Sequence, residues 1–123
     1  MPRPSRNTRS RGSFGEAAAL RVLQQHGYDI LARNWRHGHA EIDIVAREGN
    51  TIVFVEVKLR RNSRFGAPEE SVNAAKIGRT AEAGQQYLVE HSMPEADWRI
   101  DVVAIEMSTS RIDTVRLIQG IGL

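Results

Sequence analysis

The sequence of 123 residues contains no cysteine. Disulfide bonds and thiolate metal sites are therefore excluded, and the absence is consistent with a cytoplasmic protein. No apolar run approaches the length of a membrane span, and the N-terminus lacks the apolar core of a signal peptide. We therefore predict a cytoplasmic protein that does not enter a membrane. A glycine-rich phosphate loop is missing as well, because Gly120-Ile121-Gly122 has no helix after it.

Charges of the two signs are nearly balanced, but they are unevenly distributed. The formal net charge is +2, and 26% of the residues are charged and 41% hydrophobic, which is typical of a soluble globular protein. Arginine is concentrated in two stretches that contain Arg3, Arg6, Arg9 and Arg11, and Arg60, Arg61 and Arg64. Such clusters favour a polyanion as partner, although a basic N-terminal segment can also be only a solubilising extension. We predict a flexible basic arm over residues 1–12 and a single domain over residues 13–123.

Residues 40–58 have the pattern of a β-hairpin, because two runs rich in Ile and Val flank residues 48–50. A two-residue turn at Gly49-Asn50 suits the positive φ angles of hairpin turns, and counting outward from it places Asp43 opposite Glu56. The predicted charged face carries Glu41, Asp43, Glu56 and Lys58, together with Val45 and Phe54. The predicted apolar face carries Ile42, Ile44, Ala46, Val53, Val55 and Val57.

Two directly opposed carboxylates are a costly feature of this hairpin. Asp43 and Glu56 would repel each other, and in a partly buried setting one of them would tend to keep its proton. Lys58 can neutralise only one of the two, whereas a divalent cation such as Mg²⁺ between them would relieve the repulsion. The alternative is a surface hairpin whose charges face water, since a register slip of one residue would separate the two carboxylates.

The other elements follow from hydrophobic periodicity and from turn residues. In chain order, the sequence predicts a helix over 13–26, a strand over 28–35, a loop over 36–39, the hairpin over 40–58, a loop over 59–68, a helix from 68 to about 91, and strands over 98–107 and 112–118. This order predicts an α/β fold in which a central mixed sheet is flanked by helices. Gly78 and Gly84 weaken the second helix, so we expect them to mark close packing against the sheet.

Several polar residues outside the hairpin allow two interpretations. Glu16 lies three residues after Ser13, as in a helix capping box, and this role does not exclude a catalytic one. Lys76 and Arg79 lie three positions apart on the polar side of the second helix, where they form a solvated face or contact phosphates. Asp101 is either a further acidic site residue or a strand-start charge that pairs with a neighbouring arginine.

The histidines of the predicted loop, His37 and His39, suggest a metal site at first sight. A zinc site, however, requires further ligands at characteristic spacing, and these are missing nearby. Exposed histidines or phosphate contacts are the favoured interpretations.

A resemblance to known proteins rests on an ordered series of motifs. Asp43, followed by Glu56-Val57-Lys58, resembles the Asp…(Asp/Glu)-x-Lys signature of the restriction-endonuclease-like nuclease superfamily. More closely, the chain resembles the YraN-like family of bacterial proteins. The motifs are Gly15-Glu16, Gly27-Tyr28, Ala32-Arg33-Asn34-Trp35-Arg36, Glu41-Ile42-Asp43, Phe54-Val55-Glu56-Val57-Lys58, Phe65-Gly66, Lys76, Tyr87-Leu88 and Arg99-Ile100-Asp101-Val102-Val103. Ala40 departs from the family, which commonly has glycine there, and so does the short last strand.

The resemblance implies a restriction-endonuclease-like core, similar to archaeal Holliday-junction resolvases, and metal-dependent cleavage of DNA phosphodiesters. It implies that Asp43, Glu56 and Glu16 hold Mg²⁺ or Mn²⁺, and that Lys58 completes the catalytic set. We expect Lys58 to stay protonated at rest and to position a water or to stabilise the transition state.

Binding of nucleic acid is assigned to basic residues that would contact phosphates without base specificity, namely Arg60, Arg61, Arg64, Lys76 and Arg79. Because no base-reading motif is evident, we predict structure-selective cleavage of branched or junction DNA, in repair or recombination. A homodimer is a further possibility, since junction resolvases cut two symmetric strands. Two alternatives stay open: a catalytically inactive nucleic-acid-binding or adaptor module with the same fold, and a protein-interaction scaffold that uses the basic arm.

Overall fold

The computed structural model describes residues 6–61, 74–109 and 111–121, and it describes side chains from Gly15 onward. In chain order the elements are α1 (Arg6–Gln25), β1 (Asp29–His37), β2 (Ala40–Glu48), β3 (Thr51–Arg60), α2 (Ala74–Glu90), β4 (Asp97–Ser108) and β5 (Arg111–Ile118). The predicted order of helices and strands is therefore confirmed. No helix among the described residues is both long and apolar enough to cross a membrane.

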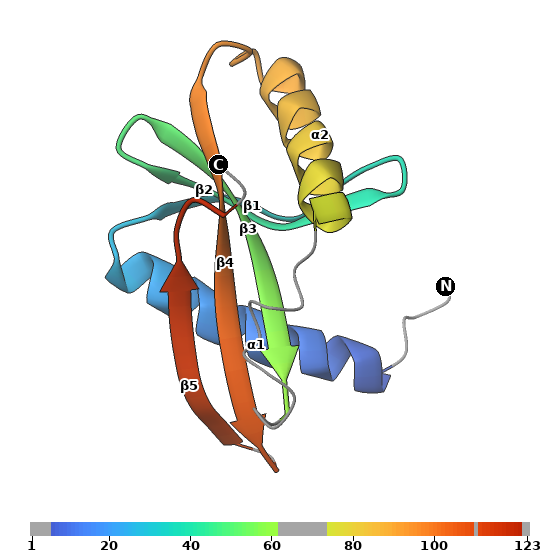
Figure 1. The fold of residues 1–123 in the computed structure, drawn as a ribbon, viewed down its shortest axis with the longest axis vertical. Helices are drawn as coiled ribbons and strands as arrows, with labels where there is room; N and C mark the ends of the chain where they lie inside the picture. Colours follow the sequence, from blue (N-terminus) through green and yellow to red (C-terminus); the bar gives the residue numbers. More distant parts are fainter. Residues whose placement is uncertain (1–5, 62–73, 110, 122–123) are drawn as a thin grey trace.

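The strands form one five-stranded sheet in the order β1-β2-β3-β4-β5 (Figure 1). The β3–β4 pair is parallel and the other neighbouring pairs are antiparallel, so the sheet is mixed, as predicted. The parallel pair follows from the chain between β3 and β4, which contains α2, because parallel strands require a long crossover connection. The fold class, a central mixed sheet flanked by helices, is confirmed.

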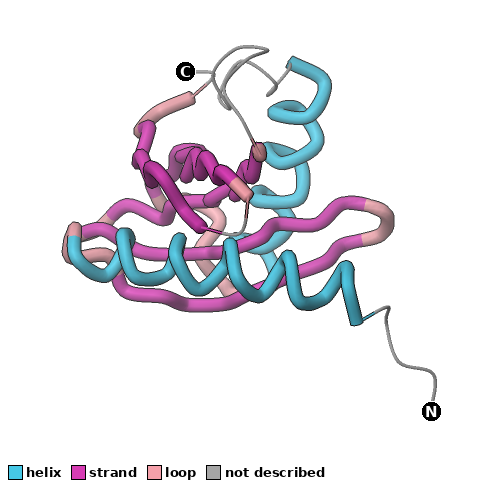
Figure 2. The backbone as a smooth tube through the Cα atoms, turned by 90° about the horizontal axis from the view of Figure 1, so that it is seen from below, coloured by secondary structure: helices cyan, strands magenta, loops and turns pink. Residues whose placement is uncertain are grey.

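The two helices cover opposite faces of the sheet (Figures 1 and 2). Beneath α1 lies the α1 cluster, whose buried members are Ala19, Leu23, Tyr28, Ile44, Ala46, Val53, Val55, Val103, Ile105 and Met107. Beneath α2 lies the α2 cluster, whose buried members are Ile42, Val45, Ile52, Phe54, Ala83, Tyr87, Leu88 and Ile100. One predicted assignment is wrong. Ile42 packs in the α2 cluster with Val45, instead of sharing a face with Ile44, so strict alternation fails in β2 near Asp43.

The first helix begins earlier in the chain than predicted. α1 begins at Arg6, inside the segment predicted to be an arm, rather than at Ser13. Because the helix runs through Ser13, this residue is not an N-cap, and the predicted capping box is wrong. The predicted stop at Gly27 is confirmed: its φ is 84°, and the N–H groups of Gly27 and Tyr28 donate to the carbonyls of Gln24 and Leu23. These two hydrogen bonds form a Schellman motif.

Two predicted loops are partly strand. β1 continues to His37 and pairs there with Ala40, so Gly38 (φ 62°) and His39 form a tight hairpin turn in place of the predicted loop over 36–39. β3 continues to Arg60, beyond the expected end at Lys58. The predicted start of the second helix at 68–70 lies outside the described residues.

Close packing against the sheet explains the presence of glycine at position 84 of α2 but not at position 78. A Cβ atom on Gly84 would overlap the ring of Phe54, so α2 can approach β3 only with glycine at this position. A Cβ atom on Gly78 would meet nothing within 4 Å, so the expectation of close packing is wrong there.

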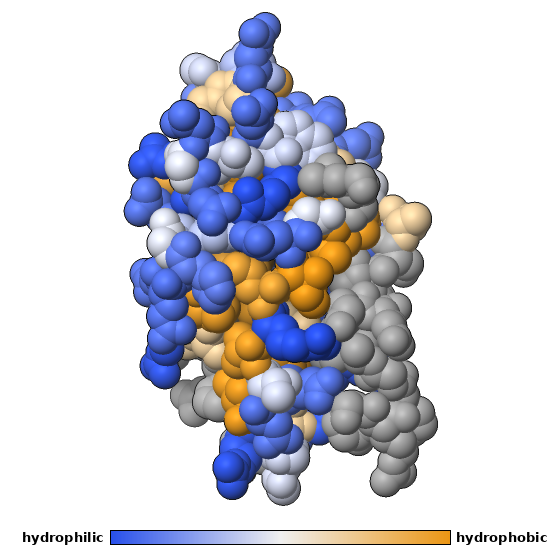
Figure 3. All heavy atoms as spheres, turned by 60° about the vertical axis from the view of Figure 1, so that its left-hand side comes forward, coloured by the Kyte–Doolittle hydropathy of each residue, from blue (hydrophilic) through white to orange (hydrophobic). Residues whose placement is uncertain are grey.

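The packing between α1 and the edge strand β5 leaves a cavity. β5 lies at the edge of the sheet, and a cavity of about 320 Å³ between α1 and β5 is lined by Ala18, Arg21, Val22, Gln25, Ile112 and Val115. Figure 3 brings forward the side on which β5 lies in Figure 1 and shows an apolar band that runs between polar groups.

Candidate functional site

The candidate site lies where β2 and β3 stop pairing. Residue pairing between the two strands begins at the turn, where Glu48 is opposite Thr51, and ends where Ile44 is opposite Val55. Asp43 is the next residue of β2 away from the turn, and it lies beyond the last pair. Beyond this point the backbone N–H of Val57 donates a hydrogen bond of 2.8 Å to Oδ2 of Asp43. The side chain of Asp43 therefore takes the place of a backbone partner. The predicted register of the hairpin is confirmed up to this point.

The two acidic residues interact strongly. Burial, followed by the charge of Glu56, raises the pKa of Asp43 from its ordinary value of 3.8 to about 7, although the hydrogen bond from Val57 lowers it. The nearby carboxylate of Glu41 adds a smaller increase. The sequence-based expectation that one of two opposed carboxylates keeps its proton is consistent with this shift.

Glu56 is almost fully buried, with an exposed fraction of 6%. Its Oε1 atom lies 3.2 Å from Nζ of Lys76 on α2. Its Oε2 atom has no hydrogen-bond partner among the described residues. A buried acceptor without a partner costs about 1–3 kcal/mol, so a cation bound at this oxygen would be stabilising.

These observations test whether a divalent cation fits. Asp43 and Glu56 offer hard oxygen donors on diverging strands, which is the donor type that Mg²⁺ and Mn²⁺ prefer. Oε2 of Glu56 has no described partner, and burial followed by the charge of Glu56 raises the pKa of Asp43, so a cation between the two carboxylates would offset an unfavourable arrangement. The residues present therefore fit such a cation.

Lys58 lies two residues beyond Glu56 on β3 and is partly exposed. On β3, Ile52 and Phe54 pack in the α2 cluster, and Glu56 contacts α2. Because side chains alternate along a strand, Lys58 lies on this same face. Lys58 therefore shares a face of β3 with Glu56, and Glu56 lies close enough to Asp43 to raise its pKa.

Glu16 lies elsewhere in the described structure. It projects from α1, where Oε1 lies 2.7 Å from Nε of Arg33, and both of its oxygens lie 3.3 Å from Nδ2 of Asn34. The described residues contain no group of three or more His, Cys, Asp or Glu side chains that could hold a metal. The structure therefore does not bring Glu16 together with Asp43 and Glu56 as a third ligand.

The predicted basic residues fall into different positions. Lys76 contacts Glu56, and the exposed Arg79 follows it on α2. Just beyond the C-terminal end of β3, Arg61 donates a hydrogen bond of 3.0 Å to the carbonyl of Thr109, and the preceding Arg60 also has an interaction. Arg64 lies outside the described residues. The contact between Lys76 and Glu56 was missed by sequence reasoning, because the two residues lie on different elements and no local pattern predicts the distance between them.

A cavity of about 220 Å³ adjoins the site between α2 and the β1–β2 turn. It is lined by His39, Ala40, Glu41, Lys76, Arg79 and Thr80. His37 lies 3.5 Å from Glu90 and stacks on Trp35. The interpretation of His37 and His39 as a zinc site gains no support within the described residues.

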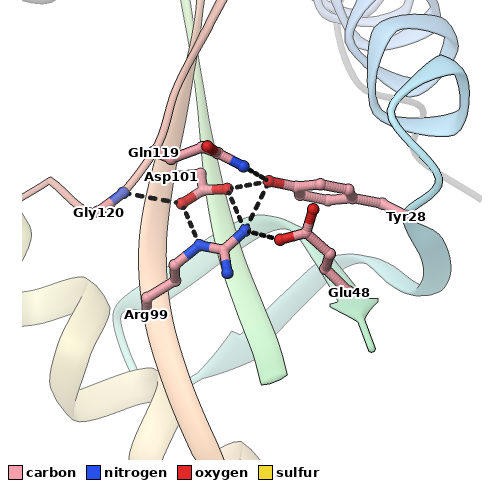
Figure 4. Close-up of polar contacts among 6 residues, drawn as sticks. All are labelled: Tyr28, Glu48, Arg99, Asp101, Gln119 and Gly120. Atoms are coloured by element: carbon pink, nitrogen blue, oxygen red, sulfur yellow. Dashed lines mark hydrogen bonds and ion pairs between the residues drawn. The ribbon is translucent and has the colours of Figure 1, made fainter. Parts of the chain in front are cut away.

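A second polar cluster joins the ends of several elements (Figure 4). Asp101, which is fully buried, accepts hydrogen bonds from the Tyr28 hydroxyl at 2.7 Å and from Nε of Arg99 and the N–H of Gly120, each at 3.0 Å. The Tyr28 hydroxyl in turn accepts from Arg99 at 2.6 Å and from Gln119 at 2.7 Å. The predicted ion pair of Asp101 with a neighbouring arginine is confirmed.

The charges of this cluster stabilise one another. Burial lowers the pKa of Arg99, but hydrogen bonds to Asp101 and Glu48 outweigh it and raise the pKa above its ordinary value. Burial, first of all, raises the pKa of Tyr28. Because both Asp101 oxygens are satisfied, the cluster is a structural brace and not a second ligand site. Sequence reasoning missed Tyr28, Glu48 and Gln119, whose contacts depend on tertiary packing.

The sequence of the chain is similar to one protein family and to individual bacterial members of it. The family model described as "Uncharacterised protein family UPF0102" matches residues 15–105. A UPF0102 protein of Beutenbergia cavernae is 40% identical over 90% of this chain and 94% of its own length. A UPF0102 protein of Chloroflexus aurantiacus is 42% identical over 99% of this chain and 98% of its own length. Among solved structures, SfsA of Pyrococcus furiosus in complex with Ca²⁺ matches with a TM-score of 0.41 and 14% identity, over 94% of this chain and 65% of that chain. The chain therefore belongs to the uncharacterised protein family UPF0102.

Proposed function

We propose that this protein is a metal-dependent endonuclease that hydrolyses DNA phosphodiester bonds in a structure-selective manner. The observation that carries the proposal is the paired placement of Asp43 and Glu56, with the buried Oε2 atom of Glu56 left without a described partner. Lys58, on the same face of β3 as Glu56, would supply a positive charge for the reaction. Two carboxylates and one amine at a strand junction are a donor set suited to phosphodiester hydrolysis.

Each residue has a role in this chemistry. A bound Mg²⁺ or Mn²⁺ would offset charge on the scissile phosphate and lower the pKa of a water. Asp43 and Glu56 would hold the cation, and the N–H of Val57 fixes the orientation of the Asp43 carboxylate. The Lys58 ammonium would orient the attacking water and stabilise the charge that develops on phosphorus-bound oxygens.

Nucleic acid would be held through its phosphates. Lys76 and Arg79 on α2, and Arg60 and Arg61 at the C-terminal end of β3, all follow the site residues in the chain and would contact the phosphates. Such contacts supply affinity and orientation but do not read bases. Because no base-reading element is evident, we propose selectivity for the shape of branched DNA, in a repair or recombination process.

One observation favours a second candidate function. The Lys76 ammonium lies against Oε1 of Glu56, so it supplies a positive charge to the Asp43–Glu56 pair. An inactive nucleic-acid-binding module could keep the site in this form.

A cleavage assay separates the two functions. Purified protein is incubated with branched and linear DNA in Mg²⁺, Mn²⁺ or EDTA, beside Asp43→Asn, Lys58→Met and the control Asp97→Asn, which changes an exposed residue at the start of β4. The enzyme predicts metal-dependent nicking that both site variants lose and the control keeps. Salt-sensitive binding without nicking, unchanged in the site variants, would favour the inactive module.

A further inference from the structure

The ion pair between Lys76 and Glu56 is asymmetric in its exposure to water. The side chain of Lys76 is 35% exposed, whereas that of Glu56 is 8% exposed, and the two charged atoms are 3.2 Å apart. The ammonium can therefore move into solvent by rotation of its flexible stem. The carboxylate has no such freedom, because β3 holds it against α2.

Lys76 also acts on Asp43. Its charge lowers the pKa of that residue, in opposition to the effects of burial and Glu56. Lys76 therefore compensates both carboxylates, which is the electrostatic role that a divalent cation would have. A lysine ammonium on Oε1 and a divalent cation on Oε2 of the same carboxylate would repel each other, because the two oxygens belong to one small group.

A destination for the displaced ammonium adjoins the site. Lys76 lines the cavity of about 220 Å³ that also contains Arg79 and His39, and this cavity opens beside Glu41. An anionic phosphate there would meet the Arg79 guanidinium and the Lys76 ammonium together.

We propose that Lys76 is the resident counter-ion of the Asp43–Glu56 pair, that a divalent cation displaces it, and that the displaced ammonium binds a nucleic-acid phosphate in the adjoining cavity. This inference rests on the proposed function. Metal binding and phosphate binding are thereby coupled through one side chain. Lys76 is a positioning residue and not a catalytic one.

The first test measures Mn²⁺ binding directly, by calorimetry and by electron paramagnetic resonance, without DNA. Lys76→Met is compared with the native chain and with Arg79→Met, which removes one positive charge from the same cavity but has no described contact with Glu56. Removing the competing ammonium should tighten Mn²⁺ binding about fivefold. Arg79→Met should change the Mn²⁺ affinity less than about twofold.

The outcomes distinguish the two proposals. If the native chain and Lys76→Met bind Mn²⁺ equally, or if both variants tighten binding alike, the role of Lys76 is refuted and the metal site stands. If neither the native chain nor Lys76→Met binds Mn²⁺, the metal site of the proposed function fails, and the inference fails with it.

The second test examines the phosphate contact in a Lys58→Met background, which prevents cleavage. Binding to a short branched DNA is measured over a range of salt concentrations, in Mn²⁺ and in EDTA. In Mn²⁺, adding Lys76→Met should reduce the slope of log affinity against log salt by about one. In EDTA, where the ammonium stays at Glu56, the slope should not change. An equal reduction in EDTA would show that Lys76 reaches phosphate without displacement and would overturn the proposal.

Discussion

The backbone N–H of Val57 donates a hydrogen bond of 2.8 Å to Oδ2 of Asp43, just beyond the last residue pair of β2 and β3. One carboxylate oxygen is thereby fixed by the neighbouring strand. The acidic side chain is held at the strand junction by the backbone itself, so its position does not depend on a bound ligand. The same hydrogen bond could be kept by the carbonyl oxygen of an asparagine, which makes Asp43→Asn a conservative probe of charge.

Asp43 should make the metal-free protein less stable as the pH rises. In the folded chain this residue keeps its proton up to about pH 7, because burial and Glu56 raise its pKa, whereas the ordinary value is 3.8. The contribution to stability is therefore complete below the ordinary pKa and is lost as the pH rises through about 7. We expect a loss on the order of a few kcal/mol. Urea unfolding in EDTA across this range measures it.

Asp43→Asn supplies the matched control for this pH dependence. The variant should resemble the native chain in stability near pH 4 and exceed it near pH 8, because asparagine does not ionise. Millimolar Mg²⁺ near pH 8 should stabilise the native chain but not the variant. A native chain that is equally stable at both pH values in EDTA would contradict the assignment.

Glu16→Gln tests whether the first helix contributes a metal ligand. Since Glu16 contacts Arg33 and Asn34 in the described structure, we expect Mn²⁺ affinity to change less than about twofold. Glu56→Gln, by comparison, should lower Mn²⁺ affinity more than tenfold, because it removes a charged donor. A tenfold loss in Glu16→Gln would instead show that this side chain leaves Arg33 to bind the metal.

Tyr28→Phe tests the brace around Asp101. Removing the hydroxyl leaves a buried carboxylate oxygen and the Gln119 amide without this partner, so we expect a loss of about 1–3 kcal/mol in unfolding free energy. Tyr87→Phe is the control, because its hydroxyl forms no hydrogen bond among the described residues, and it should change stability by less than about 0.5 kcal/mol. Equal effects of the two substitutions would refute a specific role of the cluster.

Gly84→Ala and Gly78→Ala should have opposite effects on stability. The new methyl group at Gly84 would overlap the Phe54 ring, and such overpacking costs about 1–3 kcal/mol. At Gly78 a methyl group meets nothing within 4 Å, so the better helix propensity of alanine should stabilise the protein by up to about 1 kcal/mol. Thermal unfolding of the two variants provides the comparison, and a destabilised Gly78→Ala would contradict it.

Local patterns were sufficient for the register of the β2–β3 hairpin from its turn to Ile44 and Val55. The turn at Gly49 and the alternating Ile and Val residues predict the register of β2 and β3, because both signals act between neighbours in sequence. The order of elements and the stop of α1 at Gly27 follow in the same way. The start of α1 was predicted wrongly, because Ser13 and Glu16 form a plausible cap whether or not the helix begins earlier.

The sequence by itself determined that Asp43 and Glu56 would lie near each other, since two residues on paired strands are placed by the turn between them. Only the tertiary structure decided that Lys76 lies against Glu56, that Glu16 contacts Arg33, and that Ile42 packs beneath α2. These contacts depend on the docking of helices against a twisted and diverging sheet. Side-chain packing sets that docking, and no periodicity within a single element contains it.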